Sequence, residues 1–274
     1  MQTNLMLLIV LLVVLGAAAY IFLWPILHQK VITLRPFPKS WLTIIKQRLP
    51  AFLHMPPELR IQWLRLIKTF LYSKDFVGCA GLQITEEMKV VIASQACLLL
   101  LNRPSHEYRD LRTVLVYPTT FVAKREIRDD LGLVAEQTQT LLGESWSNGK
   151  VILAWDDVEK GVRDFQDGQN VVLHEFAHQL DHESGTANGA PLLYRKNAYR
   201  TWSKVFSKEF SDLQSRLNNS VSSDINQYGA TNPAEFFAVV TEMFFERPGV
   251  LHHHHPQLFE QLLGYYSVDP REWL

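Results

Sequence analysis

The chain has 274 residues, of which 47% are hydrophobic, 11% aromatic and 20% charged, so it is not disordered, collagen-like or dominated by heptad repeats. Its 27 lysine and arginine residues nearly balance 28 aspartate and glutamate residues, and the net charge of -1 leaves no basic excess for direct nucleic-acid binding. With two cysteines, the chain has neither a disulfide scaffold nor a four-cysteine zinc cluster.

The first predicted element is an apolar helix near the N-terminus. From Leu5 to Leu27 there is no charged side chain, and a helix of this length reaches about 34 Å, enough for a hydrocarbon core of about 30 Å. A cleaved secretory signal is the alternative, because the alanines 17–19 offer a small-residue cleavage site. No basic residue precedes the apolar run, however, and its hydrophobicity continues past that site. We therefore predict a retained transmembrane anchor over residues 1–30, in contact with the lipid bilayer.

The charges that flank this anchor predict its orientation. No charged side chain precedes it, and the first acidic residue after it is Glu58. The basic residues in between are Lys30, Arg35, Lys39, Lys46 and Arg48. Because positive flanks remain on the cytoplasmic side, we expect a single-pass membrane protein with a cytoplasmic catalytic domain.

The remaining elements follow in chain order. Residues 31–57 predict a linker, because the prolines of Arg35-Pro36-Phe37-Pro38 favour extended chain. Helical periodicity extends over 58–72, 85–101, 171–181, 192–217, 234–246 and 257–266, with Thr85 and Asn170 as candidate N-caps. Segments 114–117 and 150–155 read as strands, and the histidines 252–255 as a loop closed by Pro256. The pattern predicts a mainly helical α+β fold with a small sheet, in which residues 58–274 form one domain.

One motif in this domain carries catalytic chemistry. His174-Glu175-Phe176-Ala177-His178 matches the pattern H-E-x-x-H. Histidines four residues apart share one face of a helix, so both can bind one Zn²⁺. Glu175 lies beside the first histidine and can act as general base toward a water. Apolar neighbours predict a largely buried helix, where two histidines without a metal would be costly.

A catalytic zinc needs a third protein ligand. The residues after His178 lack the glycine and the distal histidine of the metzincin extension, so the ligand must come from another helix. Glu235 and Glu242 are both candidates, because they lie seven residues apart on one face of the predicted helix 234–246. Glu235 also has a purely structural interpretation, as the third residue of a capping box that Asn232 begins. The residues alone leave this choice open.

A resemblance to a known family adds to this reading. The matching segments are 81–85, 95–98, 143–146, 151–155, 167–181, 228–238 and 255–256. Over residues 50–272 the chain resembles the Mlc titration factor A family of zinc metallopeptidases, whose active site is similar to that of anthrax toxin lethal factor. The resemblance implies a gluzincin-like zinc peptidase domain, with Glu235 as the third zinc ligand and Tyr228 as the residue that stabilises the oxyanion. The partner of the enterobacterial members, the repressor Mlc, is not indicated by this sequence.

We therefore predict a membrane-anchored zinc metallopeptidase that acts on a peptide or protein substrate. His174, His178 and Glu235 bind Zn²⁺, Glu175 transfers protons and Tyr228 stabilises the oxyanion. The alternative is a membrane-tethered regulatory protein that binds and sequesters a transcriptional repressor, in which Glu175 would be dispensable.

Two further roles stay open on the sequence. Asp181 is either the hydrogen-bond acceptor of a ligand imidazole or a surface aspartate near the end of the helix. Segment 151–155 is either an edge strand that binds the substrate by main-chain hydrogen bonds or an interior strand.

Overall fold

The computed structural model describes residues 35–103, 108–119, 121–128, 134–141, 145–146, 149–193, 195 and 197–273, together with positions 6, 11–17, 20 and 21. Most of the predicted membrane-spanning run lies outside these residues. Within them, no helix combines the length and the apolar character that crossing a bilayer requires.

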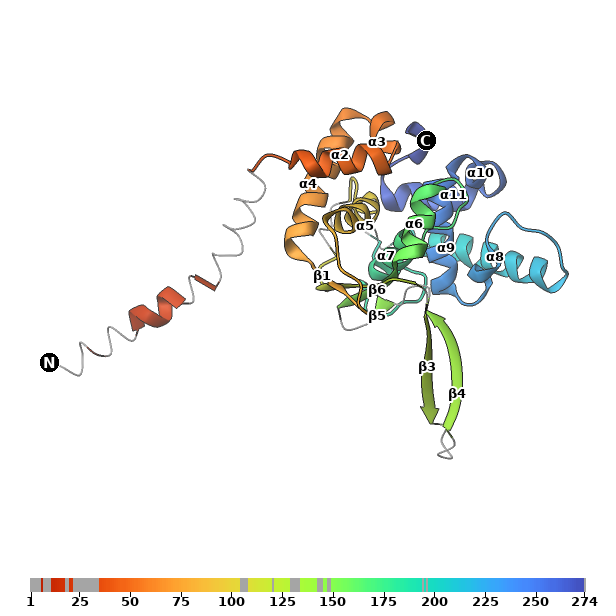
Figure 1. The fold of residues 1–274 in the computed structure, drawn as a ribbon. Coiled ribbons are helices and arrows are strands. Elements are labelled where there is room, and N and C mark those ends of the chain that lie inside the picture. Colours follow the sequence, from red (N-terminus) through yellow and green to blue (C-terminus); the bar gives the residue numbers. More distant parts are fainter. Residues whose placement is uncertain are drawn as a thin grey trace.

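The described fold is mainly helical with a small parallel sheet, as the sequence predicts (Figure 1). The α-helices are α2 (Lys39–Arg48), α3 (Ala51–His54), α4 (Pro57–Ser73), α5 (Glu86–Leu98), α6 (Trp155–Arg163), α7 (Val171–His182), α8 (Ala198–Asn218), α9 (Pro233–Glu246), α10 (Pro248–His254) and α11 (Pro256–Tyr266). Two 3-10 helices, η1 (Gln227–Ala230) and η2 (Pro270–Glu272), complete the helical part. The expected helices 58–72, 234–246 and 257–266 agree with α4, α9 and α11 to within one residue at either end.

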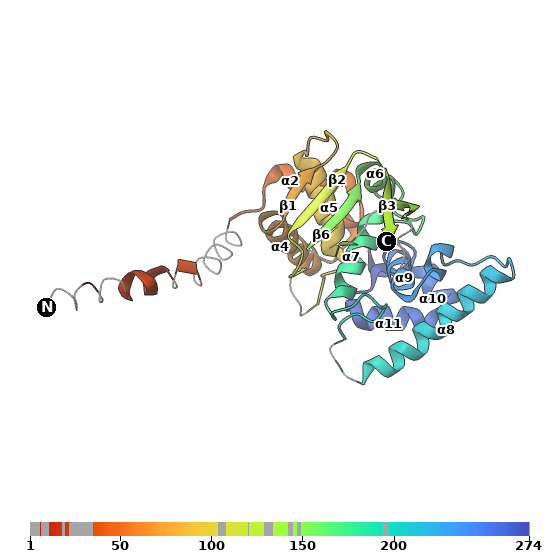
Figure 2. The same cartoon turned by 90° about the horizontal axis from the view of Figure 1, so that it is seen from below.

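The sheet has the strand order β1-β2-β6-β5. Strands β1 (Asp75–Gly78), β2 (Thr113–Tyr117) and β6 (Lys150–Ala154) are parallel, and the two-residue β5 (Ser145–Trp146) pairs antiparallel with the start of β6. Along β2, buried and half-buried residues alternate, because one face packs against the helices. Figures 1 and 2 show α4 and α5 on that face. A separate hairpin of β3 (Phe121–Arg128) and β4 (Val134–Leu141) projects from the body (Figure 1).

Helices α7 and α9 lie in the centre of the helical part (Figure 2). Apolar side chains surround both helices: Val172, Leu173 and Phe176 of α7 are fully buried, and every residue of α9 from Phe236 to Glu246 is buried. A helix buried on all sides must find partners for any polar residue it carries. Acidic residues in α9 therefore mark positions with a defined polar neighbour.

The predicted linker over 31–57 is wrong from residue 39 onward. Helices α2 and α3 occupy this segment, and their residues Ile45 and Phe52 are buried in the core. Phe52 packs against Trp63 of α4 with ring centroids 6.0 Å apart. Prolines 36 and 38 discourage helix only at their own positions and the residue before, so they could not exclude a helix that begins at Lys39.

The histidines 252–255 do not form the expected loop. The first three belong to α10, which Pro248 begins and which Leu251 anchors in the core. Histidine is only a moderate helix former, so the repeat gave no helical signal, and the buried leucine fixes the helix instead.

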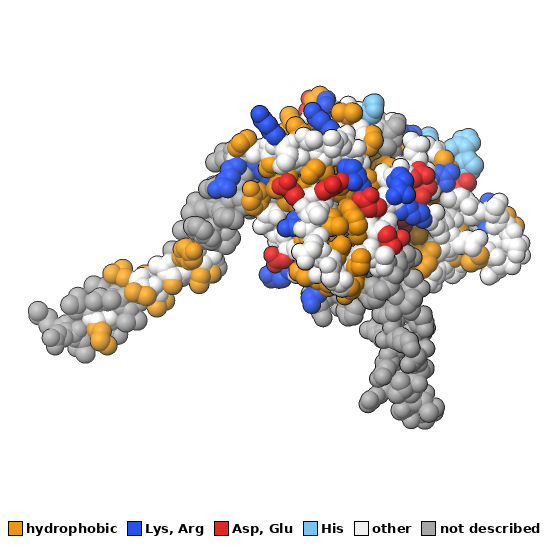
Figure 3. Space-filling view, in the orientation of Figure 1, with side chains coloured by type: hydrophobic (Ala, Val, Ile, Leu, Met, Phe, Trp, Pro, Cys, Tyr) orange, Lys and Arg blue, Asp and Glu red, His pale blue; other side chains and the backbone are white. Residues whose placement is uncertain are grey.

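Over the face seen in Figure 3, acidic and basic side chains are interspersed. This mixture agrees with the near balance of positive and negative residues in the composition.

Candidate metal centre

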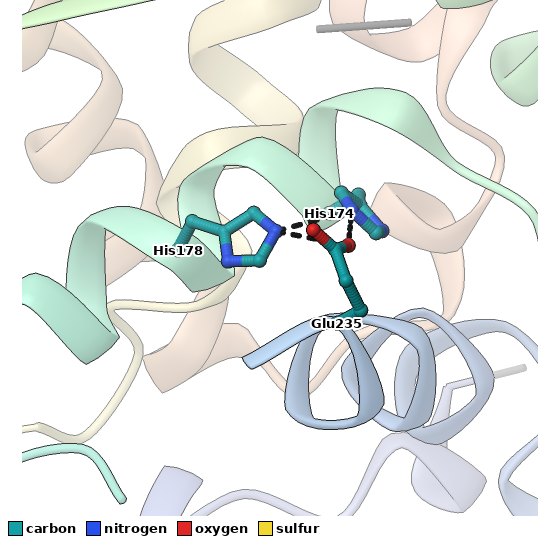
Figure 4. Close-up of side chains that lie close together, drawn as sticks. All are labelled: His174, His178 and Glu235. Atoms are coloured by element: carbon teal, nitrogen blue, oxygen red, sulfur yellow. Dashed lines mark hydrogen bonds and ion pairs between the residues drawn. The ribbon is translucent and has the colours of Figure 1, made fainter. Parts of the chain in front are cut away.

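Helix α7 carries both histidines of the H-E-x-x-H motif. Asn170 caps this helix as predicted, because its side-chain oxygen accepts the N–H groups of Val172 and Leu173 at 3.1 Å. The buried apolar residues of α7 fix its rotation, and the opposite side turns His174 and His178 toward α9 (Figure 4).

Helix α9 supplies the carboxylate that faces both imidazoles. Its N-cap is Asn232, whose side chain accepts from the N–H groups of Ala234 and Glu235 at 2.9 and 3.0 Å. The Glu235 carboxylate points toward α7, where its Oε2 lies 3.0 Å from Nε2 of His174 and 3.3 Å from Nε2 of His178. Of the two candidate third ligands, the structure thus brings Glu235 against both imidazoles.

The spacing of the three side chains fits a metal. The two Nε2 atoms are 3.2 Å apart, so all three donor separations fall between 3.0 and 3.3 Å. Ligands of a tetrahedral zinc, each about 2.0–2.1 Å from the ion, are about 3.3 Å from one another. Two imidazole nitrogens and one carboxylate oxygen also match the His₂Glu donor set of a catalytic zinc site with an open fourth position.

Glu242, the other candidate, binds the far side of the first histidine. Its Oε1 accepts a hydrogen bond from Nδ1 of His174 at 2.7 Å, and its Oε2 accepts from the backbone N–H of Asn170. Because a carboxylate can only accept, Nδ1 of His174 carries a proton, and its Nε2 is turned toward Glu235. A ligand histidine with a carboxylate behind it is the arrangement that orients metal-bound imidazoles.

The charges of the cluster shift the pKa values of its members. Burial by itself lowers the pKa of His174, but the carboxylates of Glu242 and Glu235 outweigh this effect and hold it well above its usual value. Burial acts to raise the pKa of Glu235, yet hydrogen bonds with His174 and His178 lower it to about 2. The cluster therefore holds a proton among negative groups, and a cation that binds the same atoms must displace it.

A second layer of buried polar groups supports Glu242. Asn170 donates from its side chain to Oε1 of Gln95 at 2.7 Å and to Oε1 of Glu246 at 2.9 Å, and Glu246 also accepts from the N–H of Gly168. Burial, and the nearby charge of Glu242, raise the pKa of Glu246 to about 8. Glu246 is thus largely protonated at neutral pH.

The two predicted catalytic residues lie beside this cluster. Glu175 is 1% exposed and adjoins the first histidine in α7. Tyr228 belongs to η1, and its ring centroid is 5.9 Å from that of His174. Since 50% of Tyr228 is exposed, its side chain lies where the cluster meets solvent.

Asp181 takes neither of the roles considered for it. It is fully buried, so it is not a surface residue, and its Oδ2 accepts the N–H of Gly189 at 2.7 Å. Among the described residues, no imidazole hydrogen-bonds to it. Trp202 donates to the carbonyl of Gly189 at 2.9 Å, so both polar groups of this glycine are held. Gly189 lies directly against Pro233, the first residue of α9, and Asp181 thereby helps to position the helix that carries Glu235.

Strand β6 is interior where it begins. Lys150 and Val151 pair with β2 on one side and with β5 on the other, so the edge-strand interpretation of 151–155 fails for Val151. Sequence reasoning also missed the roles of Gln95, Asn170 and Glu246 in the buried network. The available signal was two acids one turn apart, Glu242 and Glu246, within an otherwise apolar helix.

Comparisons with known proteins identify the family of this chain. The family model described as glucose-regulated metallo-peptidase M90 matches residues 24–267. The protein slr2042 of a Synechocystis species is 42% identical over 268 residues, which cover 96% of this chain and 97% of that protein. Mlc titration factor A of Klebsiella pneumoniae is 32% identical over 81% of this chain and 84% of its own, and that of Cronobacter sakazakii is 30% identical over 90% and 92%. The chain therefore belongs to the M90 family of glucose-regulated metallo-peptidases, together with the Mlc titration factors A.

Proposed function

We propose that this chain is a zinc-dependent metallopeptidase whose ion is held by His174, His178 and Glu235. The observation that carries the proposal is the convergence of three donor atoms, 3.0–3.3 Å apart, at the spacing of a tetrahedral zinc site. Membership of a metallo-peptidase family supports the same activity. A peptidase domain of the gluzincin type is part of this proposal, because its third ligand is a glutamate from a separate helix.

The bound ion supplies Lewis acidity, which polarises the substrate carbonyl and makes a water molecule more acidic. Glu175 accepts the proton of the attacking water and then delivers it to the nitrogen of the leaving amine. The electrostatic effect of the Glu175 charge on His174, which acts to raise the pKa of that imidazole, supports this role. Burial of Glu175 keeps bulk water from competing for that proton.

Tyr228 has a different task in the same reaction. Its hydroxyl donates a hydrogen bond to the oxygen that becomes negative as the water attacks. The half-exposed position of Tyr228, with its ring against His174, lets it approach a substrate from the solvent side of the cluster. Glu242 keeps the proton of His174 on Nδ1 throughout and so leaves Nε2 available as a ligand.

The decisive experiment compares metal content and hydrolysis of a mixed peptide pool for the wild type and two variants. Glu175→Gln should retain stoichiometric zinc while its rate falls by about 10²–10⁴-fold. Tyr228→Phe should also retain zinc and lose about 10²–10³-fold in kcat, the effect of removing one oxyanion donor. Wild-type protein that contains zinc and cleaves no peptide would contradict the proposal, as would a Glu175→Gln variant with full activity.

A second candidate function follows from the printed name of the relatives. Mlc titration factors A are named for titrating Mlc, so binding of a transcriptional regulator is the alternative activity. A protein that only sequesters such a regulator does not need a general base. Glu175→Gln distinguishes the two, because it should abolish hydrolysis and leave a sequestering function unchanged.

We also propose that the apolar run from Leu5 to Leu27 anchors the chain in a membrane, with the metal centre on the cytoplasmic side. The absence of charge over this run and the basic residues that follow it support the proposal. Protease treatment of sealed inverted vesicles should degrade the domain, whereas right-side-out vesicles should protect it. Recovery of the chain in the fraction free of membranes would contradict the anchor.

A further inference from the structure

A polar pocket of about 320 Å³ lies between elements that also carry the candidate metal centre. It is lined by the loop before α7, by the segment that leads into η1, and by one side of α9. The lining residues are Asp167, Gly168, Gln169, Ser223, Asp224, Ile225, Asn226, Gln227, Val239, Met243 and Arg247. Polar side chains predominate in this lining, so the pocket suits a polar ligand group.

The pocket is built on the elements that form the metal centre. Gln227 directly precedes Tyr228 in η1, and Gln169 directly precedes Asn170, the N-cap of α7. Glu235, Val239 and Met243 follow one another at four-residue spacing along α9, and Arg247 is the C-cap of this helix. The pocket and the metal centre therefore share η1, α9 and the start of α7, so a peptide bound at the metal centre can extend toward the pocket.

Arg247 is the pocket group without a charged partner. Within the described residues, no carboxylate lies within 4 Å of its guanidinium, and its methylene groups lie over Gly168, 3.2 Å from where a Cβ would stand. The two acids of the lining are already engaged. Asp167 accepts the N–H of Gln169 at 2.8 Å, and Asp224 pairs with His254 at 2.9 Å. A half-buried guanidinium with no partner is the natural binding group for an anionic ligand, above all a carboxylate.

The distance from the metal centre suits a peptide. Arg247, the C-cap of α9, follows Glu235 by twelve residues, and a helix rises about 18 Å between the backbones of two such residues. An extended peptide advances about 3.3 Å per residue. An extended peptide with its scissile bond at the metal centre therefore spans this rise in about six residues.

We propose that this pocket is a substrate-recognition site in which Arg247 binds a carboxylate of the peptide, so that the chain selects acidic peptides. The proposal rests on the metallopeptidase function and names its substrate class. The carboxylate belongs either to an acidic side chain or to the C-terminus of the peptide, and the two sources present the same chemistry to the guanidinium. Arg247 is a specificity residue, since it lies away from the bond that is cleaved.

The test measures binding, so that it does not depend on hydrolysis. Full-length protein with the Glu175→Gln substitution is titrated by calorimetry with ten-residue peptides that carry one glutamate at a varied position, no other charged side chain, and a C-terminal amide. Matched peptides carry glutamine instead, and a third set has no glutamate but a free C-terminal carboxylate. We expect at least one carboxylate peptide to bind about tenfold more tightly than its neutral match. The set in which this occurs identifies the source.

Substitutions of Arg247 connect the preference to the pocket. Arg247→Gln should remove the tenfold preference and leave binding of neutral peptides unchanged, whereas Arg247→Lys, which keeps the charge and the stem over Gly168, should retain part of it. Arg247→Glu should reverse the preference toward peptides with a lysine at that position. Arg163→Gln is the matched control, because Arg163 is an exposed arginine of α6 outside the pocket.

Two results would overturn the proposal. One is equal binding of carboxylate and neutral peptides by protein with Arg247 intact, including the absence of measurable binding of either. The other is a carboxylate preference that persists in Arg247→Gln. Failure of the metallopeptidase proposal would be recognised in a different experiment, in which wild-type protein contains zinc but hydrolyses no peptide. The preference for carboxylate peptides could still be measured in that case.

Discussion

Replacing Glu242 by glutamine tests whether this carboxylate prepares His174 as a metal ligand. In the native structure its two oxygens accept two hydrogen bonds, one from Nδ1 of His174 at 2.7 Å and one from the backbone N–H of Asn170. Glutamine offers a single acceptor oxygen, so its NH₂ group must face one of these two donors. Either Asn170 loses its partner, or His174 moves its proton from Nδ1 to Nε2, the nitrogen that would bind the ion.

The expected loss of zinc affinity follows from this change. Removing such a supporting group from a ligand histidine weakens metal binding about 10–100-fold, which corresponds to about 1.4–2.8 kcal/mol. The pKa of His174 should fall as well, because the charge of Glu242 helps to raise it. Zinc affinity is measured by competition with a chromophoric chelator at constant pH.

A matched control is available in the same molecule. Glu209 of α8 accepts from Nδ1 of His255, also at 2.7 Å, but takes no part in the metal centre. Glu209→Gln removes an equivalent carboxylate–imidazole pair and should leave zinc affinity unchanged. Equal affinities for Glu242→Gln and wild type, or equal losses in both variants, would refute the role assigned to Glu242.

Three further predictions concern the surroundings of the cluster. Burial raises the pKa of Glu246 to about 8, so its contribution to the free energy of unfolding is complete below pH 4.5 and is lost as the pH rises through 8. The loss is about 5 kcal/mol at most. Glu246→Gln should remove it, as measured by urea unfolding at several pH values. In Gly189→Ala a Cβ would stand 2.3 Å from the carbonyl oxygen of Pro233, so thermal unfolding should show lower stability and zinc titration weaker binding. Gly185→Ala is the control, because only its positive φ is strained. It should lower the stability by about 1–3 kcal/mol and leave zinc binding intact. The raised pKa of His174 retains a proton that a bound metal must displace, so zinc affinity should rise about tenfold per pH unit below that pKa. The released proton can be measured by calorimetry in two buffers. A zinc affinity that does not change with pH would contradict this prediction.

The amino-acid sequence by itself determined the local features of this protein. The start of α7 at Asn170 and that of α9 at Asn232 follow from side chains that bind backbone groups two and three residues ahead. The spacing of His174 and His178 places both imidazoles on one face for the same reason, because it depends only on the period of one helix. Each of these features needs no information from distant parts of the chain.

Only the tertiary structure decided which acid lies where. Glu235 and Glu242 share a face of α9, so helical period could not choose between them; the packing of α9 against α7 turns Glu235 to both imidazoles and Glu242 to the back of His174. The helices α2 and α10 were likewise missed, since buried residues such as Ile45 and Leu251 hold segments with weak helical signals of their own. Burial and approach are relations between residues far apart in sequence, and the packed core alone establishes them.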